Sequence, residues 1–275
     1  MAREFIPAED DMFSAGFFVE TGKYISNVIN RQAKKMGNES GTWIMHGLSA
    51  DDPECILTVE QLKDFIEKVG FIPLFKNEIP GFSVEEHTLP DYWWSGDKQR
   101  DPWEWREIIA GEGKIAYGKF FDKKAGFISR EWLPTFVNYR RDGYDFDALW
   151  EDGKAQLRQK RIMDLFDDDT EMFSNELKTK AGFGKGGEKN FEGIVTSLQM
   201  ELYLCVRDFR QRVNKQMEPY GWPISVYCKP EHLWGYGEMT AAYSEDPTVC
   251  RDRIMEHVMK LYPGAATAVA AGYRV

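Results

Sequence analysis

The stretch of this sequence that most constrains its fold is an amphipathic helix pattern followed directly by two strand patterns, within residues 158–230. After the turn GKGGEK, apolar residues recur at i, i+3, i+4, i+7 and i+11, which is the spacing of one helix face. The alternating patterns LYLCV and ISVYC follow, on either side of the polar stretch RDFRQRVNKQMEPYGW. Two shorter helix patterns precede, so the order helix, helix, helix, hairpin predicts a winged helix. The apolar face consists of Phe191, Ile194, Val195, Leu198 and Leu202.

The polar side of this predicted helix and the hairpin are candidate nucleic-acid contacts. In a DNA-binding winged helix the third helix enters the major groove, and the hairpin reaches phosphates or the minor groove. Asn190 and Gln199 carry amides that could read adenine. A structural or protein-binding role is the alternative, because cations on exposed hairpins also serve solubility and Asp208 and Glu218 interrupt this set. The candidate phosphate contacts are Lys185, Lys189, Arg207, Arg210, Arg212 and Lys215.

Helix start signals elsewhere support a mainly helical chain. Thr58 with Gln61 forms a capping-box pattern, and Asp-Pro pairs at 101–102 and 246–247 open two further helices. KIAYGKFF alternates like a strand, and residues 147–166 are predicted to form one helix. We expect a mainly α fold with small β-hairpins (α+β), built of tandem winged-helix units packed into one compact protein. The expected divisions are an N-terminal segment 1–56, a helical or winged-helix-like region 57–155, a winged helix 156–235, and a C-terminal helix and tail 236–275.

The charge distribution limits how much nucleic acid the surface can hold. Of the 35 Lys and Arg and 45 Asp and Glu, residues 174–229 contain nine and six, a local balance of +3 in a chain of net charge −10. The rest of the chain therefore carries −13. Such a balance argues against a protein coated in phosphate-binding side chains, but it allows an acidic body with one mildly basic lobe.

Several classes of function are disfavoured. No window approaches about 18 uninterrupted apolar residues, and MAREFIPAEDDMF lacks the apolar stretch of a signal peptide, so we expect a cytoplasmic protein without a membrane partner. The four cysteines and four histidines lack metal-ligand spacing, which predicts free buried thiols and no metal. Cys205 and Cys228 could lie on neighbouring strands, without a disulfide being expected. GKGGEK is not a P-loop, and we expect no cofactor.

Two runs of this sequence resemble a known family. SNELKTKAGFGKGGEKNFEGIVTSLQMELYLCV and YGWPISVYCKPEHLWG resemble the winged-helix region of AlkZ-type DNA glycosylases, and VGFIPLFKNEIPGFSVEEHT with DPWEWR resembles their upstream region. The match spans residues 57–235 and is closest to a divergent, AlkZ-related set of bacterial proteins. The resemblance implies winged-helix units around a channel for double-stranded DNA, and a role in the repair of alkylated or crosslinked bases.

The sequence departs from this family where the family carries its catalytic motif. The resemblance implies Gln-x-Gln or Gln-x-Asp, but this chain reads Pro73-Leu74-Phe75, whose side chains cannot orient a water molecule. His87 matches a family histidine. Candidate substitute groups near it are Glu78, Glu85 and Glu86, beside Trp93 and Trp94. The alternative is that VEEHT forms a solvated acidic turn and that the two tryptophans belong to the core.

Three hypotheses remain open at this point. The first is a scaffold that binds nucleic acid without the family's chemistry, and the second is an active hydrolase that uses the substitute carboxylates. The third is a structural or protein-interaction module without a nucleic-acid partner.

Overall fold

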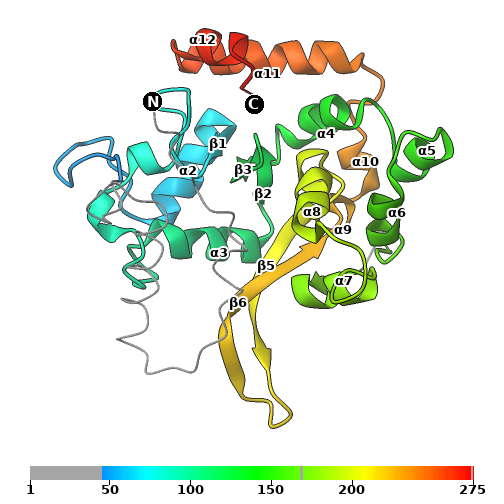
Figure 1. The fold of residues 1–275 in the computed structure, drawn as a ribbon. Coiled ribbons are helices and arrows are strands. Elements are labelled where there is room, and N and C mark those ends of the chain that lie inside the picture. The colour runs from blue at the N-terminus through cyan, green and yellow to red at the C-terminus, as the bar shows by residue number, and fades with distance from the viewer. Residues whose placement is uncertain (1–44, 168–169, 274) are drawn as a thin grey trace.

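The computed structural model describes residues 45–167, 170–273 and 275, in which helices surround one six-stranded antiparallel sheet (Figure 1). The predicted α+β class is therefore confirmed, and residues 1–44 of the predicted N-terminal segment lie outside the described residues. The first half forms α2 (Val59–Val69), β1 (Phe71–Pro73), the 3-10 helices η2 (Glu85–His87) and η3 (Pro90–Tyr92), α3 (Pro102–Glu112), β2 (Ala116–Phe121), β3 (Lys124–Ile128) and α4 (Leu133–Arg141). The second half forms α5 (Phe146–Glu151), α6 (Leu157–Met163), β4 (Met172–Phe173), α7 (Ser174–Lys180), α8 (Phe191–Met200), β5 (Cys205–Val213), β6 (Pro219–Cys228), α9 (Pro230–Trp234), α10 (Tyr236–Met239), α11 (Pro247–Leu261) and α12 (Ala265–Ala270).

Three helices begin at the predicted cap residues. Before α2, Thr58 Oγ1 accepts a hydrogen bond from the N–H of Gln61, and Gln61 Oε1 accepts one from the N–H of Thr58, both at 3.2 Å. Asp101 and Asp246 each accept from the N–H two residues later, ahead of α3 and α11. Because these caps satisfy donors that the first helical turn leaves open, they fix where the helices start.

The helix predicted over residues 147–166 was wrong as a single element. α5 ends at Glu151 and α6 begins at Leu157, and between them Gly153 has a φ of 69°. Glycine enters this left-handed region without the penalty that a β-carbon brings, so the chain turns here. The side chains and backbones of Gln156 and Gln159 then cap the new helix reciprocally.

The sheet has a symmetric strand order, β1-β3-β2-β5-β6-β4. In each half the strand that precedes the hairpin, β1 or β4, pairs with the second hairpin strand, β3 or β6. The halves meet at the centre, where Tyr117 of β2 is opposite Val206 of β5. Strands from both sides of residue 155 therefore belong to one sheet.

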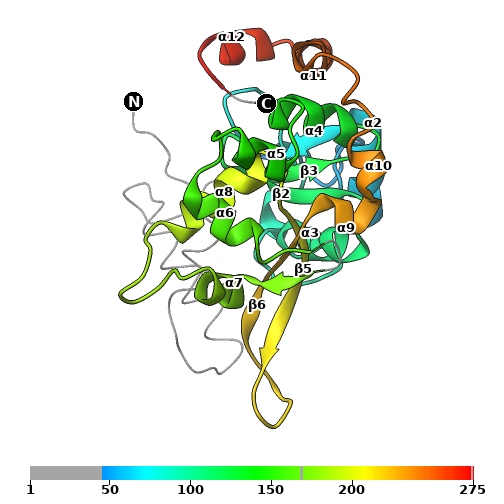
Figure 2. The ribbon, with the colours of Figure 1, turned by 90° about the vertical axis from the view of Figure 1, so that its right-hand side faces the viewer.

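The last helix before each hairpin also packs against the hairpin of the other half: α3 contacts β5, and α8 contacts β2 (Figure 2). At the first contact, the guanidinium carbon of Arg106 lies 3.7 Å from the ring centroid of Trp103 and 4.1 Å from that of Phe209. At the second, Gln199 Oε1 accepts a hydrogen bond from the N–H of Lys119. The two halves consequently share one hydrophobic core.

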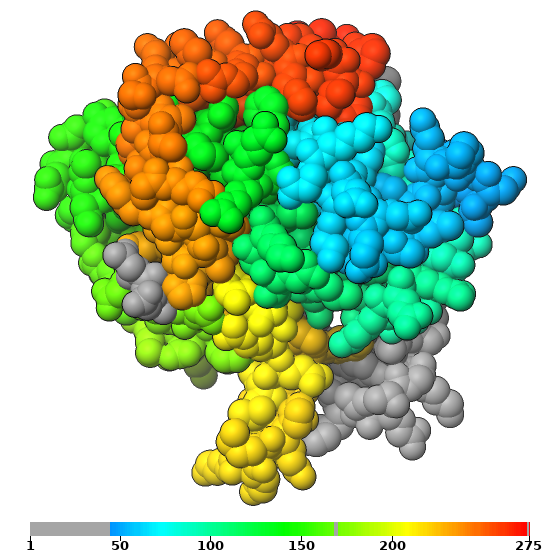
Figure 3. All heavy atoms as spheres, turned by 180° about the vertical axis from the view of Figure 1, so that it is seen from behind, coloured from blue at the N-terminus to red at the C-terminus, as the bar shows by residue number. Residues whose placement is uncertain are grey.

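The hairpin β5–β6 and helix α11 mark opposite ends of the molecule. Helix α11 crosses α4, and Nε2 of its His257 lies 2.8 Å from the carbonyl oxygen of Val69. The hairpin extends from the body at the other end, as the space-filling view shows (Figure 3). Only the base of the hairpin is buried, since residues 215–222 are exposed throughout.

Candidate nucleic-acid interface

The turn that leads into α8 presents three of the predicted contact residues to solvent. Lys185, Lys189 and Asn190 are exposed. The turn is closed by a 2.9 Å hydrogen bond from the N–H of Glu188 to the carbonyl oxygen of Gly182. The carboxylate of Glu188 also pairs with two arginines of α6, which ties the turn to the body. The predicted exposure of the helix entry is thus confirmed, and its apolar face is buried as predicted.

Gln199, on the same helix, was predicted to face outward, and this prediction was wrong. Its side chain is 1% exposed. Its Oε1 accepts from the N–H of Lys119 at 3.0 Å, and its Nε2 donates to the carbonyl oxygen of Val195 at 3.4 Å. Strand β2 packs on this flank of α8, so Gln199 joins the two halves and has no access to a base edge.

The hairpin β5–β6 ends in a tightly bonded turn. Asn214 Oδ1 accepts hydrogen bonds from the N–H groups of Gln216 and Glu218, at 2.9 Å and 3.0 Å. Arg212 stacks on its cross-strand partner, with its guanidinium carbon 4.8 Å from the ring centroid of Tyr220. Lys215 is exposed at the tip. These contacts give the hairpin a defined end that carries a cation and an aromatic ring in solvent.

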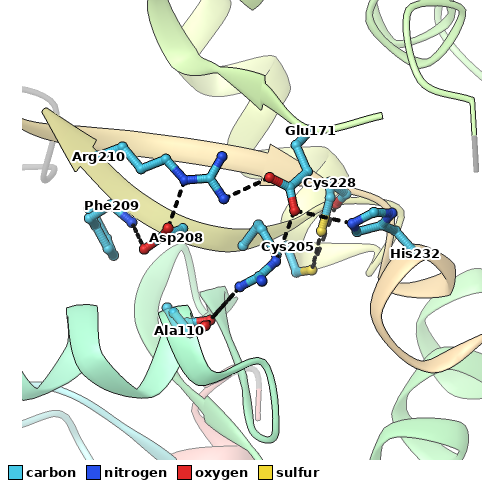
Figure 4. A network of polar contacts seen from close by, with 10 residues as sticks. Ala110, Glu171, Cys205, Asp208, Phe209, Arg210, Cys228 and His232 are labelled. Atoms are coloured by element: carbon cyan, nitrogen blue, oxygen red, sulfur yellow. Dashed lines mark hydrogen bonds and ion pairs between the residues drawn. The ribbon is translucent and has the colours of Figure 1, made fainter. Parts of the chain in front are cut away.

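Two other predicted cations, Arg207 and Arg210, have an internal carboxylate partner at the base of the hairpin (Figure 4). Arg207 Nε lies 3.0 Å from Glu171 Oε1, and Arg210 Nη2 lies 2.7 Å from Glu171 Oε2. His232 Nε2 approaches the first oxygen to 3.2 Å, and Arg210 Nε also pairs with Asp208. Although partial burial raises it, Arg210, His232 and Arg207 together hold the pKa of Glu171 below its usual range.

The Glu171 network connects three parts of the fold. Glu171 directly precedes β4, its arginine partners lie on β5, and His232 lies on α9. Arg207 Nη1 also donates to the carbonyl oxygen of Gly111, at the end of α3, at 3.0 Å. The two arginines therefore brace the hairpin against the body, and less of their charge is available to a phosphate than that of Lys185, Lys189 or Lys215.

The candidate catalytic residues lie close together in sequence, and Glu85, Glu86 and His87 are hydrogen-bonded to nearby backbone or side-chain groups. The carboxylate of Glu85 is buried and accepts from the N–H groups of His46 and Lys76, at 3.0 Å and 2.9 Å. Burial raises its pKa, although these two hydrogen bonds lower it. Glu86 and His87, which follow Glu85, also make hydrogen bonds within the fold. Glu78 is exposed. Glu86 accepts from the N–H of Gly81 and from Ser83 Oγ, and His87 Nε2 lies 2.9 Å from the carbonyl oxygen of Gly81.

A cavity of about 800 Å³ lies between α4, α8 and the β2–β3 hairpin. Asn190 lines it, which places the cavity beside the exposed helix entry. Its ionisable lining residues are Lys119, Lys123, Arg140, Glu192 and Glu201. They come from β2, the turn between β2 and β3, α4, α8 and the residue that follows α8. Sequence reasoning missed them because only the packing of α8 on β2 and α4 brings them together.

Comparison with known proteins identifies the family. A family model described as AlkZ related matches residues 56–271, most of the chain. The chain belongs to the AlkZ-related family. No curated protein and no solved structure matches it significantly. The resemblance stated from the sequence is thereby confirmed at the level of the family.

In this AlkZ-related protein, Pro73, Leu74 and Phe75 lie where the hydrophobic core meets the end of β1. Their backbones are engaged: the carbonyl oxygens of Pro73 and Leu74 accept from the N–H groups of Val84 and Glu85, at 2.9 Å and 3.0 Å. The ring of Phe75 packs against Trp93, Trp94 and Trp103, with centroids 5.4–6.4 Å apart. These three side chains are buried and apolar, and they offer nothing that could hold a water molecule.

The cysteines, the possible metal ligands and the apolar helices complete the comparison with the sequence. All four cysteines are free and buried, as predicted, and Cys205 and Cys228 are cross-strand partners with their sulfur atoms 3.7 Å apart. Within the described ranges, His, Cys, Asp and Glu form no group of three or more suited to a metal ion. No helix among these described residues combines the length and the apolar character needed to cross a bilayer.

Proposed function

We propose that this AlkZ-related protein binds double-stranded DNA through a winged helix formed by residues 157–228. The observation that carries the proposal is the hairpin β5–β6, which projects from the body (Figure 3), together with the exposed entry of α8 in the same half of the chain. The elements α6, β4, α7, α8, β5 and β6 follow the winged-helix order, and β4 pairs with β6. In such a fold the third helix approaches the major groove while the hairpin reaches the backbone or the minor groove.

The first half of the described chain supports a tandem arrangement. It runs α2, β1, the η2–η3 segment, α3 and the hairpin β2–β3, and β1 pairs with β3 as β4 does with β6. We infer that it is a second winged-helix unit, related to the first across the β2–β5 pair. Its third helix, α3, is largely buried, and so are the strands of its short hairpin β2–β3, so among the described residues only the second unit offers a long exposed hairpin to DNA.

The charges available to DNA are few and local. Lys185 and Lys189 lie in the turn before α8, and Arg212 and Lys215 lie on the hairpin. None of the four takes part in an ion pair with any other described residue. In a chain with a net charge of −10, a small set of phosphate contacts predicts modest affinity that falls with salt.

In this proposal the protein binds DNA but does not release bases through the catalytic motif of the family, which reads Pro73-Leu74-Phe75 in this chain. The apolar surroundings of Pro73, Leu74 and Phe75 support this part of the proposal, and so do the backbone hydrogen bonds that hold Glu85 and Glu86. A hydrolase that uses these carboxylates and a protein-interaction module remain outcomes of the tests below.

Fluorescence anisotropy with a labelled duplex of about 20 base pairs, from 25 to 200 mM salt, tests the proposal. We expect saturable binding at low salt and a linear fall of log K with log salt. Absence of binding to the duplex at 25 mM salt would overturn the proposal and favour the interaction module.

A further inference from the structure

The cavity between α4, α8 and the β2–β3 hairpin contains an acidic side chain that the proposed DNA contact does not use. Glu201, directly after α8, accepts from Ser197 Oγ at 2.7 Å and from Gln159 Nε2 at 2.9 Å. Burial raises the pKa of Glu201 above its usual value, although these hydrogen bonds lower it. A carboxylate accepts about four hydrogen bonds, so part of its acceptor capacity remains for a ligand in the cavity.

The cavity also has a cationic side. Lys119, Lys123 and Arg140 line it, against the carboxylates of Glu192 and Glu201. The guanidinium of Arg140 is fixed there by hydrogen bonds to the carbonyl oxygens of Phe120 and Met200, at 3.1 Å and 3.3 Å. Lys119 is buried, and Lys123 is the exposed cation of this lining, so its ammonium can meet a negatively charged group of a ligand. The cavity is thus suited to a ligand with a negatively charged group.

The volume and the polar groups together restrict the ligand class. About 800 Å³ falls within the range of small-molecule sites, about 300–1,000 Å³. A carboxylate recognises adjacent N–H donors, and guanine presents such a pair on its Watson–Crick edge, whereas the same edge of adenine presents an N–H and an acceptor. Lys123 on the cationic side can meet a phosphate.

We propose that this cavity binds a guanine nucleotide, with Glu201 accepting from the base and Lys123 contacting the phosphate. The nucleotide is either free or an unpaired guanine of a DNA strand held at the neighbouring interface. The second case rests on the proposed function, because Asn190 belongs to both the cavity and that interface.

Isothermal titration of the full chain with GMP, AMP and guanosine tests the free ligand. We expect GMP to bind about 5- to 150-fold more tightly than AMP, which corresponds to the 1–3 kcal/mol by which one matched pair of hydrogen bonds discriminates. Glu201→Gln is expected to abolish this preference. Lys123→Met, an exposed substitution, should lower GMP affinity several-fold and leave guanosine affinity unchanged. Lys260→Ala on α11 is the matched control and should change neither.

Duplexes with one unpaired dG or dA test the strand-borne ligand, beside a fully paired duplex. A preference for dG that Glu201→Gln removes supports the inference even without GMP binding, and GMP selectivity alone supports the free-nucleotide form. If the paired duplex binds but neither GMP nor unpaired dG is preferred, the inference is wrong and the proposed function stands. If GMP binds selectively while no duplex binds, the proposed function is wrong and the cavity assignment stands.

Discussion

The side-chain oxygen of Gln199 accepts a hydrogen bond from the backbone N–H of Lys119, a residue 80 positions earlier, at 3.0 Å. Both groups are buried, and the bond joins α8 of the second half to β2 of the first. This bond helps to fix the position of α8 relative to the first half. Since α8 also borders the proposed DNA contact, the bond affects the geometry of that contact as well.

Replacing Gln199 with leucine is expected to lower the free energy of unfolding by about 1–3 kcal/mol, because the N–H of Lys119 then loses its partner in the core. Urea denaturation measures the loss. Lys189→Ala, at the exposed entry of the same helix, is the control and should stay within about 0.5 kcal/mol of wild type. Equal stability of the two variants would contradict the structural role given to Gln199.

The Glu171 network predicts a pH dependence of stability. The folded-state pKa of Glu171 lies below its unfolded value of about 4.3, so its contribution is present above that value and is lost as the pH falls through the folded pKa. Glu171→Gln should therefore lower stability at pH 7 by about 1 kcal/mol and make much less difference in strong acid. Thermal melting from pH 7 down to about pH 1.5 checks both points. A constant difference across this range would contradict the assignment.

The four cations at the proposed interface make a quantitative prediction for DNA affinity. If Lys185, Lys189, Arg212 and Lys215 each contact one phosphate, each alanine variant should reduce the slope of log K against log salt by about 0.9. Anisotropy titrations at four salt concentrations measure this slope. Lys260→Ala, at the opposite end of the molecule, should leave it unchanged. Equal slopes for all variants would exclude these four contacts.

The carboxylates near η2 are expected to be structural. Glu85→Gln should lower stability by about 1–3 kcal/mol, because its amide nitrogen cannot accept from one of the two backbone donors. In an abasic-site assay on alkylated and crosslinked duplexes, wild type, Glu85→Gln and Glu86→Gln should all stay at background. Base release by wild type that either folded variant loses would instead establish the hydrolase hypothesis.

Much of the second unit could be predicted because its signals are local. The spacing of Phe191, Ile194 and Leu198 placed one face of α8 in the core, and Lys189 and Asn190 were correctly predicted to be exposed. Gln199 follows Phe191 by eight residues, about 80° around the helix, at the margin of the apolar face. Whether such a residue is buried depends on the strand that packs there, which the pattern of the helix does not contain.

Neither the ion pairs of the two arginines nor the cavity could be predicted, for the same reason. Arg207 and Arg210 follow the pattern of an exposed hairpin, but their partner Glu171 lies before β4 and meets them only through the pairing of β4 with β6. Glu201 has no motif around it, and its environment is made by Gln159 and by residues of α4 and β2. The ion pairs and the lining of the cavity depend on contacts between residues far apart in the sequence. The helices and strands of the site depend mostly on local signals, which are the cap residues and the spacing of apolar residues.

The central β2–β5 pair has a mechanical consequence for a bound duplex. Tyr117 pairs with Val206, and a helix of each half packs on a strand of the other half. The two halves therefore cannot move independently, as domains joined only by a flexible linker can. A double helix that touches both the α8 entry and the tip of the hairpin must therefore supply the adjustment itself. Bending a site of 20–30 base pairs by 40–90° costs about 1–6 kcal/mol, so flexible sequences should be held longest.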